Sequence, residues 1–341
     1  MSKNYSFSRI TTYSKCGQMY KLKYIDKMPS DSTTATLTGN ICHEVLEELH
    51  LNGGNSLEIL VGNLESILQK RNIAVPKGYV EKLSSLFLLQ EELYFRASAE
   101  YDGPDAIRKR DGTVSAYPEM TGTWIKEVKR LNIEGIKVDI DNQFAFLNPE
   151  LIEISISDVM VDSFNILKKY SIPESIVKTL HTELPISKEV DGEILNQVKI
   201  PEKYVDGDDI NLVAFIDWIG ITKVNGKEGL TIIDYKTNKS NTDSNQVKYN
   251  AQLCIYSYAV EKVLGQKVDR IGIHHLRSNT LHLAKVDPKI VDDVMANTFN
   301  PHLSIKQGIF KKHMPDSNYS PCLNMYGKKC PYINNCYPNL N

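Results

Sequence analysis

The sequence predicts an α/β fold in which a central mixed β-sheet is flanked by helices. Apolar runs typical of strands occur in the C-terminal half, at residues 181–186, 211–219, 229–236 and 270–276. A helical pattern at about 246–264 separates the third run from the fourth, and another fits residues 287–299. Strands interspersed with helices in this order form one sheet covered by helices.

The N-terminal half reads as mainly helical. One short helix is expected before residue 29, with Cys16 near its start, and a longer one opens at Gly39 and places His43 near its N-terminus. Residues 56–99 repeat their apolar positions at threes and fours. Residues 102–122 are rich in Gly, Pro and charge and predict a connection. The stretch 123–171 predicts a mixture, with a strand near 136–140 and a helix near 156–170.

Composition suits one large globular domain, or a catalytic core with a substantial insertion. The chain has 341 residues, of which 41% are hydrophobic, and a formal charge of −2. That charge is uneven, because residues 1–30 carry six Lys or Arg against one acid and residues 301–341 carry five against one. If the two ends meet in space, they form a positive surface suited to a polyanion. Scattered, solvated lysines are the alternative.

The sequence also bears on location. No signal peptide is visible at the start, and no run approaches the roughly 18 apolar residues that a membrane span needs. We therefore expect a soluble, cytoplasmic protein with no membrane partner. In a reducing compartment, its six cysteines are expected to be metal ligands or small buried side chains.

Two acids and a lysine stand out within the apolar runs. Asp217 lies in one predicted strand and Asp234 near the end of the next, and a hairpin turn at 224–227 would bring both to one end of the sheet. Lys236 follows Asp234 by two residues and so points to the same face. Carboxylates and an ammonium in this arrangement suit Mg²⁺-dependent phosphoryl chemistry. Taken singly, each residue could be an ordinary turn or cap residue.

Gln252 and Tyr256 lie four residues apart and share one face of the predicted helix that follows Lys236. They could hold DNA or orient the lysine. Core or surface packing is the alternative for the pair alone.

These motifs resemble the PD-(D/E)XK nuclease superfamily, in its RecB-like exonuclease branch. The resemblance is carried by Gly39-x-x-x-His43, Ala214-Phe-Ile-Asp217, Asp234-Tyr-Lys-Thr237 and Gln252-x-x-x-Tyr256, which occur in the order and rough spacing of that group. It differs at Ala214, where a glycine is usual, and at Asp234, where the second acid is often Glu. The resemblance implies a restriction-endonuclease-like core.

The resemblance also assigns roles to residues. His43, Asp217 and Asp234 would bind Mg²⁺ or Mn²⁺, together with the backbone carbonyl of Tyr235. Lys236 would be the catalytic lysine, and Gln252 and Tyr256 would form the accessory motif. Glu183 matches an acid often found on the preceding strand, although we favour a structural role for it.

Four cysteines resemble the iron-sulfur staple of RecB-like nucleases, including the CRISPR adaptation nucleases. Cys322, Cys330 and Cys336 form C-x7-C-x5-C near the C-terminus, and Cys16 is a fourth. Four thiolates suit a [4Fe-4S] cluster or zinc, and the absence of close C-x2-4-C pairs favours the cluster. Such a staple would join the two basic ends. Cys42 and Cys254, within apolar helical patterns, are predicted to be buried.

We divide the chain into a cluster-ligand and metal-ligand segment (1–43), a largely helical insertion (44–180), the PD-(D/E)XK core (181–300) and a C-terminal cysteine segment (301–341). The expected function is a Mg²⁺- or Mn²⁺-dependent DNA exonuclease acting on DNA ends or single strands in replication, recombination or repair. A structure-specific endonuclease and a non-catalytic iron-sulfur scaffold are the alternatives. The sequence has no G-x-x-x-x-G-K-[ST] phosphate loop, so unwinding would need a separate helicase or recombination protein. A compact chain of this kind suits a phage genome. A phage-encoded protein would be located in the host cytoplasm.

Overall fold

The structure is a computed structural model. It describes residues 4–29, 34–70, 77–98, 156–238, 243–315, 320–323 and 329–338, together with short segments between 107 and 147. Within these residues, no helix is both long and apolar enough to cross a membrane.

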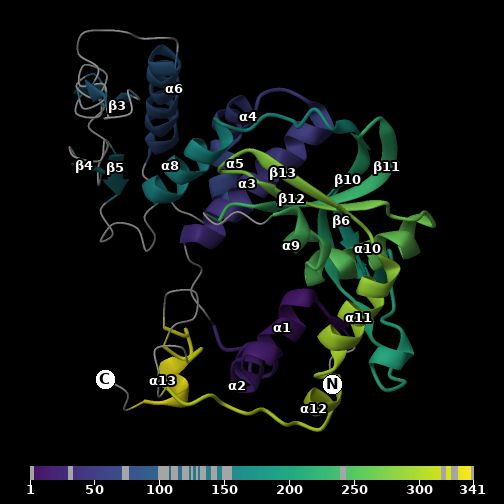
Figure 1. The fold of residues 1–341 in the computed structure, drawn as a ribbon. Coiled ribbons are helices and arrows are strands. Elements are labelled where there is room, and N and C mark those ends of the chain that lie inside the picture. The colour runs from purple at the N-terminus through teal and green to yellow at the C-terminus, as the bar shows by residue number, and fades with distance from the viewer. Residues whose placement is uncertain are drawn as a thin grey trace.

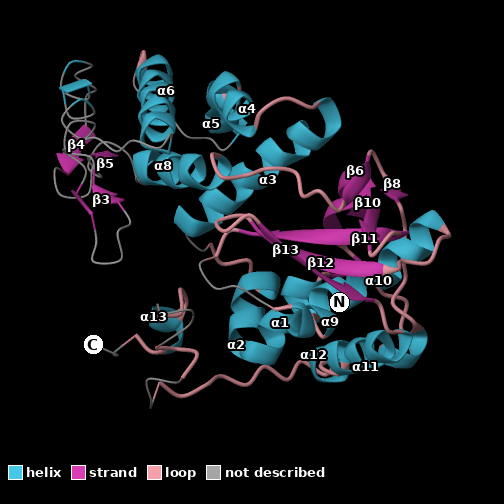
Figure 2. Ribbon diagram, turned by 45° about the horizontal axis from the view of Figure 1, so that its top comes forward, coloured by secondary structure: helices cyan, strands magenta, loops and turns pink. Residues whose placement is uncertain are grey.

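A mixed five-stranded sheet forms the centre of the fold, as the sequence predicts. Its strand order is β13-β12-β11-β10-β6; β11 and β12 are parallel and the other pairs are antiparallel (Figures 1 and 2). The strands are β6 (Ile176–Ile186), β10 (Ala214–Val224), β11 (Lys227–Lys236), β12 (Arg270–His275) and β13 (Thr280–Lys285).

The predicted hairpin turn joins β10 to β11. Asn225 and Gly226 both have positive φ, the conformation that a two-residue turn of this kind requires. Antiparallel pairing runs from Val224 opposite Lys227 to Trp218 opposite Ile233. This register brings the next pair, Asp217 and Asp234, together at the open end of the hairpin.

Helices cover the sheet on both sides, and each side has its own apolar core. One core joins α10 (Ala251–Leu264) and α11 (Pro288–Phe299) to sheet residues such as Ile232 and Ile271. The other core joins the sheet, through Trp218 and Ile233, to a helical lobe. The lobe's elements are α3 (Thr34–Asn52), α4 (Ser56–Gly62), α5 (Leu64–Lys70), α6 (Tyr79–Ser98) and α8 (Ile156–Leu167).

Small elements complete the fold. Three two-stranded sheets pair β2 (Ile107–Arg108) with β3 (Val114–Ala116), β4 (Ile136–Asp139) with β5 (Phe144–Leu147), and β7 (Lys188–Val190) with β8 (Glu193–Leu195). A parallel pair joins β1 (Asn4–Tyr5) to β9 (Asn211–Leu212), which anchors the N-terminus beside the central sheet. Short helices occur at Glu202–Tyr204, α9 (Ser244–Lys248) and α12 (His302–Lys306).

The two ends of the chain meet. The N-terminal segment comprises α1 (Phe7–Lys15), α2 (Gly17–Tyr20) and a π-helix (Lys21–Ile25), and the C-terminal segment ends in α13 (Ile333–Cys336) (Figure 1). Gln18 N donates to Lys311 O at 3.0 Å, and the Tyr332 hydroxyl donates to Met28 O at 3.3 Å. A Cβ on Gly17 would lie 2.9 Å from Lys311 N, so glycine permits this close approach.

The structure corrects several predicted boundaries. The helix α3 begins at Thr34, so His43 lies in its middle and not near its N-terminus. Its first turns are rich in threonine, which has a low helix propensity. The burial of Leu37 in the apolar core of the lobe stabilises these turns. The one short helix expected before residue 29 is instead divided into α1 and α2, and Cys16 lies between them, at the start of α2 as its N-cap.

Two further elements differ from the sequence patterns. The helix expected at 246–264 is split into α9 and α10, because Asn250 is extended and its side chain caps Leu253 N at 3.0 Å. The strand β13 has no apolar run to reveal it, since it is a half-buried edge strand held by pairing with β12. Short strands also occur within the connection expected at 102–122.

Close packing around Gly220 gives a test of the sheet. A Cβ there would lie 2.2 Å from Lys178 O and 2.5 Å from the Trp218 ring. We expect Gly220→Ala to destabilise the protein by about 1–3 kcal/mol through overpacking, measured by chemical denaturation. At Gly62, a helical residue with nothing within 4 Å of the added Cβ, alanine should leave stability unchanged or slightly raised. Equal effects at both glycines would contradict this packing.

Candidate active site

The site lies at the end of the sheet where β10 begins and β11 ends. There the Tyr235 backbone N–H donates to Asp217 Oδ2 at 2.8 Å, which fixes one carboxylate against the neighbouring strand. Asp234 precedes Tyr235 and has a side chain that is only 6% exposed. The hairpin therefore holds two carboxylates close together with little access to water.

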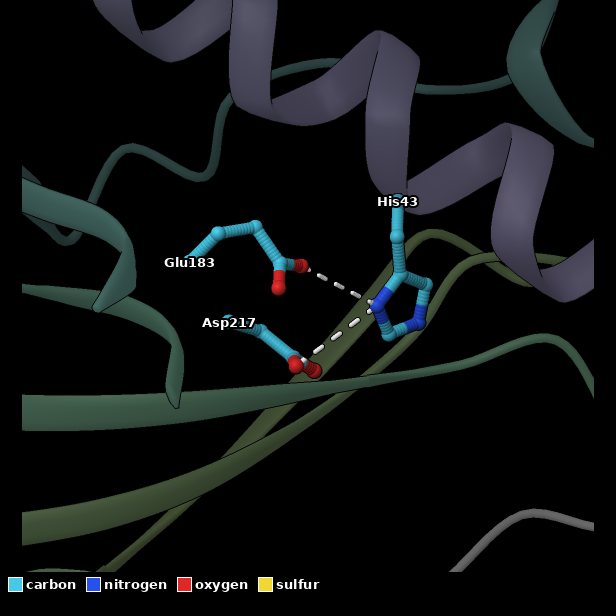
Figure 3. Close-up of side chains that lie close together, drawn as sticks. All are labelled: His43, Glu183 and Asp217. Atoms are coloured by element: carbon cyan, nitrogen blue, oxygen red, sulfur yellow. Dashed lines mark ion pairs between the residues drawn. The ribbon is translucent and has the colours of Figure 1, made fainter. Parts of the chain in front are cut away.

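His43 joins the site from the helical lobe. Its Nδ1 lies 3.5 Å from Asp217 Oδ1 and 3.6 Å from Glu183 Oε1, and Figure 3 shows the three side chains converging from α3, β6 and β10. Within the described residues, this is the one group of three or more possible metal ligands whose atoms all lie within 4.8 Å of one another. The sequence order hides this group, because its members are more than 30 residues apart.

Glu183 has an unusual backbone. Its φ is +46°, within the left-handed region that non-glycine residues rarely occupy, although it lies inside β6. The register of β6 with β10 places it opposite Asp217. Strain of this kind, costing about 1–3 kcal/mol, persists where the surroundings impose it and often marks functional sites. Sequence reasoning favoured a structural role for Glu183, and the kinked strand that directs it toward His43 has no signature in the sequence.

The second carboxylate is held from the other side. Asp234 Oδ2 lies 2.6 Å from Lys236 Nζ, and Asp234 Oδ1 accepts a hydrogen bond from Gln252 Nε2 at 2.8 Å. Gln252 also donates to the Tyr256 hydroxyl at 3.1 Å, across one turn of α10. Lys236 thus lies beside Asp234, and Gln252 beside Tyr256, as their spacings of two and four residues predict. The contact of Gln252 with Asp234 is one that the spacing does not predict.

Charge in the site is unbalanced when no metal is bound. Burial raises the pKa of Asp234 most and the nearby charge of Asp217 raises it as well, whereas Lys236 and His43 lower it, and the resulting pKa is about 6. At His43 burial opposes protonation, but hydrogen bonds to Asp217 and Glu183 outweigh it and raise the pKa to about 10. The pKa of Asp234 is thus raised mainly by its own burial, and that of His43 by the two carboxylates beside it.

This environment fits a divalent cation. Carboxylate oxygens are the donors that Mg²⁺ and Mn²⁺ prefer, and an imidazole nitrogen suits Mn²⁺ and other transition metals. Asp217, His43 and Glu183 supply such donors within one small volume, and Asp234 adds a buried carboxylate beside them. The Tyr235 side chain packs edge-on against the His43 ring, with centroids 5.8 Å apart.

The four predicted cluster cysteines also come together. Cys16, Cys322 and Cys330 are buried in one apolar cluster, and Cys336 packs against it. Burial raises the pKa of Cys330, and repulsion from Cys322, Cys16 and Cys336 raises it further. All six cysteines are free thiols, and Cys42 and Cys254 are buried elsewhere, as predicted.

A positively charged pocket of about 400 Å³ connects this N-terminal segment with the site. Its lining includes Lys15 and Lys23, hydroxyl groups of α1, Tyr332 of the cysteine segment and, at the catalytic end, Gln252. Among the described residues that line it, none has an acidic side chain. Two lysines of the N-terminal segment and two uncharged residues of the C-terminal segment, Pro331 and Tyr332, thus line one pocket that reaches Gln252.

A comparison with protein families decides the classification. The family model of the PD-(D/E)XK nuclease superfamily matches residues 4–337, almost the whole chain. The chain belongs to the PD-(D/E)XK nuclease superfamily. A search of curated proteins finds no match. The predicted family is confirmed, and with it a metal-dependent nuclease that acts on DNA. The mixed sheet flanked by helices fits the restriction-endonuclease-like α/β fold of this superfamily.

The pKa of Asp234 predicts a stability change. Its folded-state pKa, about 6, lies above the ordinary aspartate value of 3.8. In the absence of metal, its charge therefore destabilises the fold above pH 6, and it does so less as the pH falls through 6. We expect Asp234→Asn to raise Tm in EDTA at pH 7.5 by roughly 2–4 °C, and by less at pH 5.

The same variant should lose most of the Tm increase that Mn²⁺ gives the unaltered protein, because a ligand stabilises only the state it binds. Differential scanning fluorimetry measures both effects. Asp293→Asn, at an exposed position of α11, serves as the control and should behave like the unaltered protein. A lower Tm for Asp234→Asn in EDTA would show that its carboxylate is a net stabiliser.

Proposed function

We propose that the protein is a DNA exonuclease that hydrolyses phosphodiester bonds of DNA ends or single strands with Mg²⁺ or Mn²⁺. The observation that carries this proposal is the pairing, at one sheet end, of a carboxylate–histidine group with the Asp234–Lys236 pair. The carboxylate–histidine group suits a cation, and the Asp234–Lys236 pair suits a nucleophile and a phosphate.

The metal ligands in this proposal are His43, Asp217, Asp234 and the backbone carbonyl of Tyr235, with Glu183 as a further carboxylate close to His43. When bound, the cation would polarise the scissile phosphate and lower the pKa of a water molecule. Glu183 and Asp217 hold the His43 ring from one side. Because the Tyr235 N–H holds Asp217, the carboxylate stays oriented without the help of long side chains.

Lys236 would orient or deprotonate the attacking water and offset the charge that develops on the phosphate. Its ammonium lies beside Asp234, which keeps it at the site while its side chain remains 36% exposed to an incoming substrate. Gln252 holds the other Asp234 oxygen, and Tyr256 holds Gln252. This relay keeps the carboxylate from rotating away from the lysine.

The positive pocket supports DNA binding at the ends of the chain. Two lysines and several hydroxyls without an acid suit a phosphodiester backbone, and the pocket reaches Gln252. A strand bound along it would place its phosphates in line with the site.

We further propose that Cys16, Cys322, Cys330 and Cys336 bind a [4Fe-4S] cluster that fastens the two ends together. Zinc sites are usually built from close C-x2-4-C pairs, which these four cysteines lack, so the cluster is favoured over zinc.

Removal of either member of the Asp234–Lys236 pair tests the catalytic assignment. We expect Asp234→Ala and Lys236→Ala to lower cleavage at least 10³-fold while DNA binding is largely kept. The exposed Asp293→Ala and Lys267→Ala are matched controls and should retain activity. Turnover of either site variant at the unaltered rate would refute the assignment.

The mode of attack is tested with end-labelled linear DNA beside closed circular DNA. An exonuclease degrades the linear form from its ends and spares the circle, whether single- or double-stranded. Cleavage of circles would identify a structure-specific endonuclease instead. Each substrate is tested with Mg²⁺ and with Mn²⁺, after EDTA has been removed.

The cluster is tested at Cys336. Cys336→Ser should lower both the iron content of anaerobically purified protein and its Tm, because the ends lose their fastening. Cys254→Ala, in the core around α10, is the control that should keep its iron. Unchanged iron and Tm in Cys336→Ser would rule out ligation by this residue.

A further inference from the structure

A second groove opens on the His43 side of the site, and its lining shares no residue with that of the positive pocket. Its volume is about 520 Å³, within the range of roughly 300–1,000 Å³ typical of ligand sites. His43 and Glu183 belong to its lining, so it is continuous with the proposed metal-ligand group. The rest of its lining comes from α3, α5 and the β6–β7 and β10 strands: Asn40, Glu44, Glu47, Lys70, Pro185, Lys188 and Phe215.

Phe215 is the unusual member of this lining. It lies two residues before Asp217 on β10, where burial alternates, and its side chain is left 44% exposed between the buried Ala214 and Ile216. Lys188 Nζ lies 5.5 Å from the ring centroid. An aromatic ring exposed in a groove beside a catalytic carboxylate, with a cation against it, offers a stacking surface with a phosphate-binding charge.

The charge of the groove indicates which part of DNA enters it. Glu44, Glu47 and Glu183 line it against Lys70 and Lys188, and Lys70 is paired with Glu44 at 2.6 Å. This balance disfavours a phosphate deep in the groove. A nucleobase is neutral, and its amino groups can donate hydrogen bonds to carboxylates, as cytosine N4 does.

We propose that this groove binds one unpaired nucleobase next to the scissile phosphate, with the base stacked on Phe215 and the adjoining phosphate held by Lys188. The inference rests on the proposed nuclease function and gives it a substrate preference. A base in a duplex is already stacked and paired, so it enters the groove only from a single strand or a frayed end. Phe215 is thus a specificity-determining residue for single-stranded DNA.

Base stacking can be measured without turnover. In the Lys236→Ala background, which keeps all proposed metal ligands, a single-stranded oligonucleotide with 2-aminopurine near its end is titrated in Mg²⁺. Stacking on Phe215 should quench its fluorescence. Phe215→Leu, which keeps an apolar side chain but removes the ring, should abolish the quenching and weaken single-strand binding by roughly 10-fold. Phe215→Trp should preserve both.

Blunt duplex DNA and a remote residue supply the controls. Phe215→Leu should change the binding of blunt duplex by less than twofold. Leu303→Ala on α12, where the side chain is 46% exposed, should change neither measurement. The inference is wrong if Phe215→Leu keeps the quenching, or weakens single-strand and duplex binding equally.

Cleavage by the protein with Lys236 intact separates this inference from the proposed function. If the protein cleaves single strands and Phe215→Leu leaves KM unchanged, base binding in the groove is refuted and the proposed nuclease function is retained. In contrast, no cleavage of any DNA refutes the nuclease, and the groove assignment with it. If both hold, Phe215→Leu should raise KM for single strands and leave kcat little changed.

Discussion

Two buried carboxylates, Asp217 and Asp234, lie at the open end of one hairpin and repel each other. The surrounding side chains offset this repulsion. Burial makes this repulsion strong, because little water screens it. Each carboxylate has positive or polar partners. Asp217 contacts His43 and the Tyr235 N–H, and Asp234 contacts Lys236 and Gln252. Such a site is costly without a cation and suited to bind one.

Distant parts of the chain supply these partners at one end of the sheet. The helical lobe supplies His43 from the middle of α3, where packing of Ile41, Val45 and Leu46 fixes the orientation of the helix. The helix α10 supplies Gln252 from its first turn, and Asn250 caps that turn. A helix held by its core presents a ligand with less entropy cost than a loop does.

The two grooves divide the surroundings of the site by charge. On the Gln252 side, Lys15 and Lys23 line a pocket together with Pro331 and Tyr332 of the cysteine segment. None of its described lining residues is acidic. On the His43 side, glutamates and Phe215 line a groove that suits a neutral ring better than a phosphate. In the proposed function, the pocket on the Gln252 side would bind the backbone of a DNA strand, and the groove on the His43 side would bind its unpaired base.

The sequence by itself determined the hairpin, its two acids and the lysine, because strand period and an Asn-Gly turn are local properties. It also determined that Gln252 and Tyr256 share a helix face, since a spacing of four does so in any helix. Only the tertiary structure decided the place of Glu183, because a left-handed residue inside a strand arises from the pairing of β6 with β10. The depth of His43 in α3, the split between α9 and α10, and the edge strand β13 likewise depend on packing and capping across the fold. The exposure of Phe215 also depends on the tertiary structure, since nothing in an apolar strand pattern shows which ring stays exposed.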